Sequence, residues 1–456
     1  MRINILLIIL TGILFSACSM SEPKLDTKID TDENYSIDTD LNVSVNVKWW
    51  EEYNSVVLNK LIEKALSKNP SLLASYEKII QAQITLNNAG ESYKPSLKAD
   101  AQSSINKSYP NGADHTTAKR TNAQVSMSYE LDIWGKVAAQ IEAANSNISV
   151  SIYDQEAAKL SLVSNIIQNY FEYISTKEKL SFSKKNLTLA KKTLDIMNHK
   201  FDFGEINYID LSRQKQVYLQ ESSSLVSLQN ELNSYKNALA ILVGDNPSSF
   251  EIDDHNLTDI SIPKINAGLP SDLLYKRPDI ASQKAAIESS KALIQVADAT
   301  RFPSFSLSAA MGSASEKLIS LNNPTNSISA GLGISYNILD YTRLNNLKLI
   351  EESKARALVQ NYKDTVLNAF REVEDSLNSI NYTTKELILE YEVLDESKKA
   401  FEIAKIQYKL GAIDFNTFLD IQKSFFNAQQ QYINVQKKKL IATLNLNKAL
   451  GGGFKY

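Results

Sequence analysis

Few side chains in this sequence could carry out covalent or metal chemistry. The three histidines, His115, His199 and His255, are far apart, and none has the spacing of a metal site. No glycine-rich phosphate loop follows an expected strand, and no serine nucleophile elbow occurs. With five methionines in 456 residues, a methionine relay for copper or silver is not expected. The sequence therefore predicts no enzyme, no cofactor and no metal site.

The single cysteine, Cys18, has the position of a lipid attachment site. It follows Arg2, an apolar run from Ile5 to Phe15 and two small residues, which together predict a secretory signal peptide over 1–17. The site is similar to a bacterial lipoprotein cleavage site, although Phe15 stands where leucine is commoner. Cleavage there would leave Cys18 as the acylated N-terminus, and stable anchoring takes more than one acyl chain. The alternative is an incidental cysteine in a discarded leader.

Two charged residues near the C-terminal end could act on ions. Asp420 lies nine residues past Gly411, and Lys423 follows one helical turn later, where an i,i+3 pair is possible. If three copies surround one axis, three Asp420 carboxylates form a ring, and such rings favour cations and can gate a pore. The alternative is a solvated position on a helix.

Strands are predicted where apolar and polar residues alternate, because successive side chains of a strand face opposite sides. The alternation covers four segments: 97–105, 123–133, 305–311 and 328–338. They pair into two hairpins, over 96–133 and 304–338. The longer runs have about eleven residues, the length that a tilted strand needs to cross a bilayer. A strand of a soluble sandwich would alternate as well, so this pattern alone does not decide.

The pattern occurs twice along the chain. Pro70 and Pro278 are 208 positions apart, and Gly204 and Gly411 are 207 apart. Four windows contain neither glycine nor proline: 136–203, 205–243, 343–410 and 412–450. Each half therefore predicts a long helix, a turn and a second helix. In the long windows apolar residues such as Val163, Ile167 and Tyr170 recur every three or four positions, as in a narrow coiled-coil seam.

These markers set the expected domain organisation. The predicted parts are a signal peptide (1–17), an N-terminal tether and belt segment (18–57), a first repeat (58–244), a linker (245–268), a second repeat (269–451) and a tail (452–456). The Trp49-Trp50 pair that ends the tether is expected to pack against a neighbouring helix. A formal charge of −3, from 49 basic and 52 acidic residues without a basic stripe, argues against nucleic acid as a partner.

A protein with four membrane strands must assemble with copies of itself. The smallest membrane barrels have about eight strands, and an open sheet edge in lipid costs several kcal/mol per unpaired backbone group. A homotrimer supplies twelve strands, whose polar faces would line a water-filled pore. Aromatic residues near the strand ends, including Trp134 and Phe302, would lie in an aromatic girdle; ordinary packing at a strand–helix junction is the alternative.

Several short blocks together resemble the outer-membrane efflux lipoproteins of the TolC family. They are Leu269-Pro270-Ser271-Asp272-Leu273-Leu274, Arg277-Pro278-Asp279-Ile280, Phe302-Pro303-Ser304 and Ala449-Leu450-Gly451-Gly452-Gly453. The resemblance implies a mixed α+β membrane protein. In it, a trimeric, twelve-stranded outer-membrane β-barrel with four strands per chain continues into a long α-helical coiled-coil periplasmic tunnel. The implied function is a passive exit duct for drugs and other small toxic compounds. The implied partners are a periplasmic adaptor (membrane fusion protein) and an inner-membrane pump of the resistance-nodulation-division (RND) type.

The resemblance also implies functional residues at the helix turns. In the family, an aspartate matching Asp420 lines the periplasmic constriction, and residues matching Tyr408 and Asp210 link neighbouring hairpins when the channel is closed. The tips meet the adaptor, which makes Gly204 and Gly411 the contact candidates; a turn requirement alone would explain both glycines equally well. An arginine that some relatives carry in the closing network matches Ile413 here, and this difference weakens the expected closure.

Two other functions stay open from the sequence. One is an outer-membrane factor of type I protein secretion; the lipid-bearing Cys18 and the glycine-rich terminus favour the efflux duct over it. The other, from a different class, is a periplasmic coiled-coil adaptor or scaffold. Four strands of bilayer length with polar inner faces argue against that class.

Overall fold

The computed structural model describes residues 25–29, 35–36, 46–109, 111–112, 114–253, 256–263 and 268–454. Cys18 and His255, singled out above, lie outside these residues. The chain divides into two compact units. The first contains Lys78–Ile152 and Ser282–Lys363; the second contains Tyr153–Ala281 and the described residues from Asp364 on. Each unit therefore draws on both halves of the chain.

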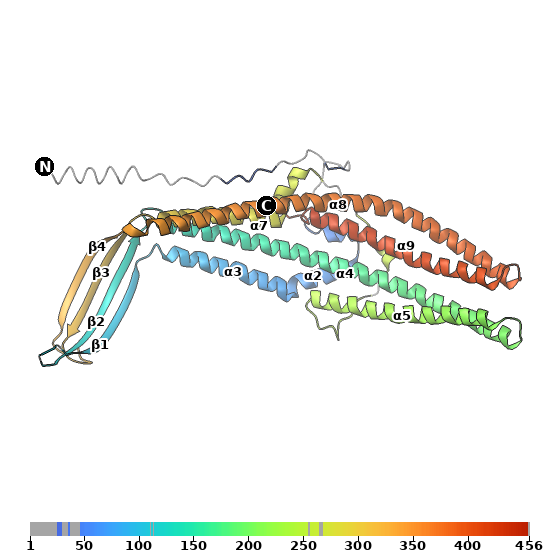
Figure 1. The fold of residues 1–456 in the computed structure, drawn as a ribbon, viewed down its shortest axis with the longest axis horizontal. Helices are drawn as coiled ribbons and strands as arrows, with labels where there is room; N and C mark the ends of the chain where they lie inside the picture. The colour runs from blue at the N-terminus through green and yellow to red at the C-terminus, as the bar shows by residue number, and fades with distance from the viewer. Residues whose placement is uncertain are drawn as a thin grey trace. The chain divides into compact units, whose positions relative to one another are not determined.

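The first unit is built around one antiparallel sheet with strand order β1-β2-β3-β4 (Figure 1). The strands are β1 (Ser96–Ser108), β2 (Thr116–Leu131), β3 (Ser304–Ser315) and β4 (Thr325–Ser335). The predicted strands all form. The segments 132–133 and 336–338 do not belong to them. Asp132 instead accepts the N–H groups of Val137 and Ala138, at 3.0 Å each, at the start of the next helix. Ile338 begins a short helical turn.

The helices follow the same order in both halves. Helix α3 (Pro70–Glu91) precedes β1 and α4 (Lys136–Asp202) follows β2; α7 (Pro278–Ala299) precedes β3 and α8 (Tyr341–Lys409) follows β4, after the short turn η4 (Ile338–Asp340). Helices α4 and α8 have 67 and 69 residues, so the predicted long helices are confirmed. Within the described residues, no helix is both long and apolar enough to pass through a membrane.

The second unit pairs each long helix with a shorter one. Helices α5 (Tyr208–Leu242) and α9 (Phe415–Ala449) follow the predicted turns. Its short elements are η1 (Trp49–Tyr53), α2 (Val56–Lys68), η2 (Leu257–Asp259), η3 (Pro270–Asp272) and α6 (Leu273–Lys276). Trp49 and Trp50 are buried in the same core as Phe250 and Ile260, two residues of the segment between the repeats. The predicted packing of the tryptophan pair is therefore confirmed. The segment between the repeats contributes to the same core.

The predicted narrow seam is wrong in the middle of α4. Ile166, Ile167, Tyr170 and Phe171 are all fully buried, so the helix presents two adjacent apolar stripes rather than one. The reason is that η1, α2 and the segment between the repeats share one core with this part of α4. On α8 the seam is narrow as expected.

Candidate functional site

The two helix turns in the second unit have the same backbone construction. Gly204 and Gly411 both have φ of 73°, a left-handed conformation that other residues rarely adopt. The residue after each glycine donates its N–H to a carbonyl five positions back, Glu205 to Lys200 and Ala412 to Gln407, both at 2.8 Å. This is the Schellman arrangement that ends helices. A Cβ on either glycine would meet nothing within 4 Å, so both tips are open to a partner.

The start of each following helix is also alike. The Asn207 side chain accepts the N–H of Asp210 at 2.9 Å, and the Asp414 side chain accepts that of Thr417 at 2.8 Å. Each cap satisfies one of the N–H groups that a helix start leaves unpaired. Asp210 is thereby fixed in the first turn of α5, where it is half-buried.

Tyr408 belongs to an aromatic cluster near the turn. Its ring stacks on Phe418, with centroids 5.1 Å apart and an interplanar angle of 13°, and Phe415 lies at 5.7 Å. Its hydroxyl donates to the sulfur of Met197 at 3.3 Å. Burial, with a smaller contribution from the Asp210 charge, raises the pKa of Tyr408. Within one chain, Tyr408 thus joins α8 to α4 and α9, with Asp210 nearby.

Ile413, at the position where some relatives carry arginine, packs against the same cluster. An aliphatic side chain here adds apolar contact and no hydrogen bond.

Asp420 and Lys423 both lie on the exposed face of α9, while Leu419, just before Asp420, and Gln422, between the two, are buried. Among the described residues the Asp420 carboxylate has no ion-pair or hydrogen-bond partner, so the i,i+3 pair considered from the sequence does not form within the chain. An unpaired, exposed carboxylate is what a ring of three copies would require.

The structure adds two residues that the sequence reasoning missed, Arg213 and Glu221, which face this part of α9. Arg213 lies nine residues past Gly204, as Asp420 lies nine past Gly411, and it donates to the side chain of Asn416 on α9. Glu221 and Lys423 line a cavity of about 290 Å³ between α5 and α9. Burial raises the pKa of Glu221. The offset of 207 residues would have revealed Arg213; nothing in the sequence signalled the cavity.

Two buried glutamines differ in how well they are satisfied. Gln214 on α5 and Gln422 on α9 are both fully buried. The Gln214 side-chain N–H donates to the carbonyl of Ala190 at 2.9 Å, and only its side-chain oxygen has no partner among the described residues. Within the described chain neither polar atom of the Gln422 side chain has a hydrogen-bond partner, and an unsatisfied buried amide is costly. The hairpin of the second half therefore contains a weak point next to Asp420.

The sheet has one apolar and one polar face, as the cross-strand register requires. Four rows of neighbouring side chains make up the apolar face: Leu131, Phe305 and Ile334; Tyr129, Leu307 and Leu332; Leu97, Met127, Ala309 and Ala330; Ala99, Val125, Met311 and Ile328. The other face carries Asp100, Gln124, Ser126, Ser308 and Ser329 at the intervening positions. The predicted division into a lipid-compatible face and a polar face is present in all four strands.

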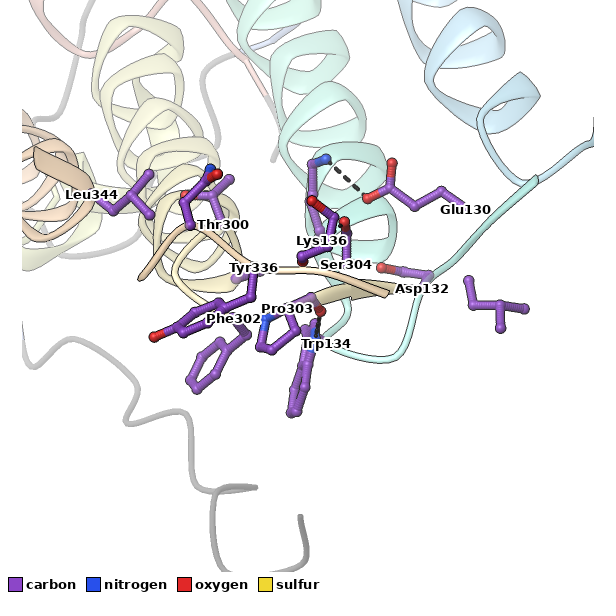
Figure 2. Close-up of a pocket in the computed structure, with 14 residues that line it drawn as sticks. Glu130, Asp132, Trp134, Lys136, Thr300, Phe302, Pro303, Ser304, Tyr336 and Leu344 are labelled. Carbon is purple, nitrogen blue, oxygen red and sulfur yellow. Dashed lines mark hydrogen bonds and ion pairs between the residues drawn. The ribbon is translucent and has the colours of Figure 1, made fainter. Parts of the chain in front are cut away.

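A cavity of about 140 Å³ lies where the strands meet the helices of the first unit (Figure 2). Trp134 stacks on Phe302, with ring centroids 4.7 Å apart, and its indole N–H donates to the carbonyl of Pro303 at 2.7 Å. Glu130 and Lys136, also on the cavity wall, form an ion pair at 3.3 Å. These contacts join the β2–α4 turn to the α7–β3 turn. Of the two explanations for these aromatics, junction packing is observed, and a girdle stays a prediction.

No group of three or more histidine, cysteine, aspartate or glutamate side chains in the described part of the chain is arranged to hold a metal ion.

The model of a family described as outer membrane efflux protein matches residues 61–245 and 269–452. The pyoverdine export outer membrane protein OpmQ of Pseudomonas aeruginosa is 28% identical over 416 residues, which are 89% of this chain and 87% of OpmQ. The cation efflux system protein CusC of Escherichia coli is 26% identical over 413 residues, 90% of this chain and 89% of CusC.

The fold is similar to that of a solved outer membrane channel. The CmeC channel of Campylobacter jejuni matches with a TM-score of 0.85 and 22% sequence identity, over 96% of this chain and 94% of CmeC. The similarity includes both halves, the sheet and the long helices. The predicted fold class is confirmed for the single chain: four strands, long paired helices and an internal duplication.

Proposed function

The chain belongs to the outer membrane efflux protein family, and from this premise we propose that three copies form the exit duct of a tripartite efflux pump. Membership confirms the resemblance inferred from the sequence, and with it the outer-membrane location and the function as an efflux channel. The protein is a channel and not an enzyme. The alternative of a periplasmic adaptor or scaffold is thereby excluded.

The observation that carries the trimer is the open sheet. In the described chain β1 pairs only with β2 and β4 only with β3, so both sheet edges expose backbone N–H and C=O groups. In hydrocarbon each unpaired group costs several kcal/mol. Pairing β4 of one copy with β1 of the next removes both edges, and three copies give twelve strands. The polar faces then line an aqueous lumen.

The tips of the second unit are the proposed docking surface for a periplasmic adaptor. Gly204 and Gly411 turn the chain without a side chain, and their surroundings are open. A helical hairpin of the adaptor could therefore lie against the backbone of both turns. The inner-membrane pump, proposed to be of the RND type, would connect to the duct through this adaptor.

The cargo is proposed to be drugs and other small toxic compounds, chosen by the pump. The relatives are named for different cargoes, pyoverdine for OpmQ and cations for CusC. A duct shared by such chemistries selects little by itself. Deleting the gene should lower the inhibitory concentrations of several unrelated drugs and bile salts together. Loss of a secreted protein with unchanged drug tolerance would instead favour type I secretion.

Cys18 is proposed to carry the lipid anchor of this duct. Metabolic labelling with an alkyne fatty acid should mark the protein, and Cys18→Ala should abolish the label. Labelling that persists in Cys18→Ala would contradict this assignment.

The periplasmic gate is proposed to consist of Asp420, Tyr408, Asp210 and Lys423. The exposed Asp420 carboxylates would form the ring. The Tyr408 hydroxyl, which the stacked aromatic rings hold in place, would link neighbouring hairpins in the closed channel. Asp420→Ala and Tyr408→Phe should each raise single-channel conductance in planar bilayers. Lys385→Gln, at an exposed position elsewhere on α8, is the control. Unchanged conductance in both gate variants would remove the assignment.

A further inference from the structure

The apolar face of the sheet ends in a row of hydroxyl side chains. Beyond the four apolar rows come Ala101 and Ala123, and then Ser103, Thr121 and Ser315, which lie opposite one another on β1, β2 and β3. The Ser103 and Thr121 hydroxyls are 2.9 Å apart. This hydroxyl row lies toward the end of the sheet that bears the two hairpin turns. It therefore marks the outer limit of the surface suited to lipid tails.

The loop between β3 and β4, residues 316–324, folds back over this row; we refer to it as the strap. The Thr121 hydroxyl donates to the carbonyl of Lys317 at 2.7 Å, and the N–H of Ile319 donates to the Ser103 hydroxyl at 3.0 Å. The Ser315 hydroxyl donates to the carbonyl of Asn322 at 3.2 Å as the strap returns. The second hairpin thus places its loop on the apolar side of the first hairpin.

The strap exposes large apolar side chains on that side. Leu318, Ile319 and Leu321 are 38%, 83% and 42% exposed. Ile319 has φ of 52°, a conformation that is unfavourable for a β-branched residue. The hydrogen bonds to the hydroxyl row hold this backbone in place, and they leave the Ile319 side chain almost entirely outside the protein.

Lysines surround the strap on its outer side. Lys119 and Lys107 project from the same face of β2 and β1, one and two rows beyond the hydroxyl row, and Lys317 belongs to the strap. All three are exposed. Among the described residues, no carboxylate lies within ion-pair distance of their ammonium groups. Apolar side chains at the rim of a lipid-facing surface, with cations just beyond, match the layering of a lipid with an anionic headgroup.

We propose that the strap is a lipid-binding rim: Leu318, Ile319 and Leu321 enter the outer leaflet, and Lys107, Lys119 and Lys317 bind the phosphate of an anionic lipid. The surface is continuous with the four apolar rows, which face lipid if the proposed barrel forms. The inference therefore rests on the proposed function, and the experiment separates the two.

The first test measures the depth of residue 319. Ile319→Cys is labelled with an environment-sensitive fluorophore and reconstituted in liposomes that contain brominated phospholipid. Val125→Cys, within the apolar rows, and Gln124→Cys, on the polar face, are the controls. Protein without an added cysteine measures any reaction at Cys18. We expect the label at 319 to be quenched less than the label at 125 and more than the label at 124, because its side chain would lie at the membrane interface.

The controls show which proposal fails. Quenching at 125 with none at 319 beyond that at 124 would overturn the rim and leave the barrel intact. Absence of quenching at 125 as well would overturn both.

The second test addresses the lysines. The triple variant Lys107→Gln, Lys119→Gln and Lys317→Gln is compared with the wild type in binding phosphatidylglycerol, measured by native mass spectrometry. We expect an affinity loss of up to about a hundredfold, because each of the three lysines near an anionic surface contributes about fivefold. The matched control replaces Lys78, Lys385 and Lys398, exposed helix lysines, by glutamine. An equal loss in the control, or no loss in the rim variant, would contradict the headgroup site.

Discussion

The turns that close the two repeats share one geometry and differ in chemistry. In the first, the Asn69 amide donates to the carbonyl of Leu242, the last residue of α5, at 2.9 Å. In the second, the Arg277 guanidinium donates to the carbonyl of Ala449, the last residue of α9, at 3.1 Å. Each donor precedes the proline that begins the next helix. Both satisfy a carbonyl that the end of a helix leaves unpaired.

The difference lies in what each donor requires around it. Asn69 is neutral, and its side-chain oxygen also accepts the N–H of Leu72 at 2.9 Å. Arg277 is only 9% exposed and bonds to Asp279 at 2.7 and 3.0 Å and to Glu372 at 2.7 Å. Burial lowers the pKa of Arg277, but the bonds to Asp279 and Glu372 outweigh it and raise the pKa above its usual value.

In both repeats a side chain before the proline donates to the last carbonyl of a helix. The charged donor, Arg277, contacts more helices than the neutral donor, Asn69, does. The neutral turn connects α3 to α5. The charged turn connects α7, α8 and α9, and it depends on two carboxylates. The second repeat should therefore be the more sensitive of the two.

The largest loss of stability is expected at the two glycines where the structure has no space for a side chain. A Cβ on Gly451 would lie 1.9 Å from the Lys276 carbonyl oxygen, and on Gly244 it would lie 2.7 Å from that of Lys68. Both glycines have positive φ. Gly451→Ala should cost roughly 3–5 kcal/mol of unfolding free energy through clash and strain, and Gly244→Ala less. Denaturant unfolding in detergent measures both. Gly411→Ala, which has the strain without the clash, is the control; an equal loss in all three would refute the packing argument.

Next in size is the loss of the two donors. Arg277→Ala leaves Glu372, Asp279 and the Ala449 carbonyl without their partner. Because Asp279 and Glu372 are 39% and 43% exposed, water compensates in part, and the expected cost is about 2–3 kcal/mol. Asn69→Ala should cost about 1–2 kcal/mol, since one hydrogen bond and one helix cap are lost. Melting temperatures of the two variants rank them, and a greater loss for Asn69→Ala would reverse the comparison.

A smaller effect, of opposite sign in the two repeats, is expected at the buried glutamines. Gln422→Leu removes an amide that has no partner and should stabilise the protein by about 1 kcal/mol. Gln214→Leu breaks the bond to Ala190 and should destabilise by about 1 kcal/mol. Chemical denaturation of both variants tests the pair. Destabilisation by Gln422→Leu would mean that its amide is satisfied, for example by water or a second copy.

The smallest effect on stability is expected at Asp420 and Arg213, two exposed residues at equivalent positions of the two repeats. Substitutions at exposed positions usually stay within about 0.5 kcal/mol. In the pore, however, Asp420→Asn should weaken cation preference, and Arg213→Gln should strengthen it, because charged rings set ion selectivity. Reversal potentials in a salt gradient measure both. A shift in the same direction for the two variants would show that they do not line one passage.

The helices, the strand faces and the turns of this protein depend on neighbouring residues in the sequence. The sequence by itself was therefore sufficient to predict them. Long windows without glycine or proline, in which apolar residues recur every three or four positions, predict long helices. Alternation with a period of two determines which strand residues share a face. Gly204 and Gly411 were predicted to be turns because they interrupt these windows, and the structure gives both a positive φ. The repeats were visible because two copies of one pattern carry the same breaks.

Tertiary structure decided what depends on neighbours distant in sequence. Arg277 could be placed in a motif, but its bonds to Glu372 and Ala449 join residues 95 and 172 positions away. The strap crosses to Ser103 from 216 positions away, and no periodicity predicts such a contact. The wide buried face of α4 likewise depends on which elements cover it. Neighbouring residues in the sequence determine the helices and strands. Which side chains are buried or paired depends on which distant segments of the chain pack against them.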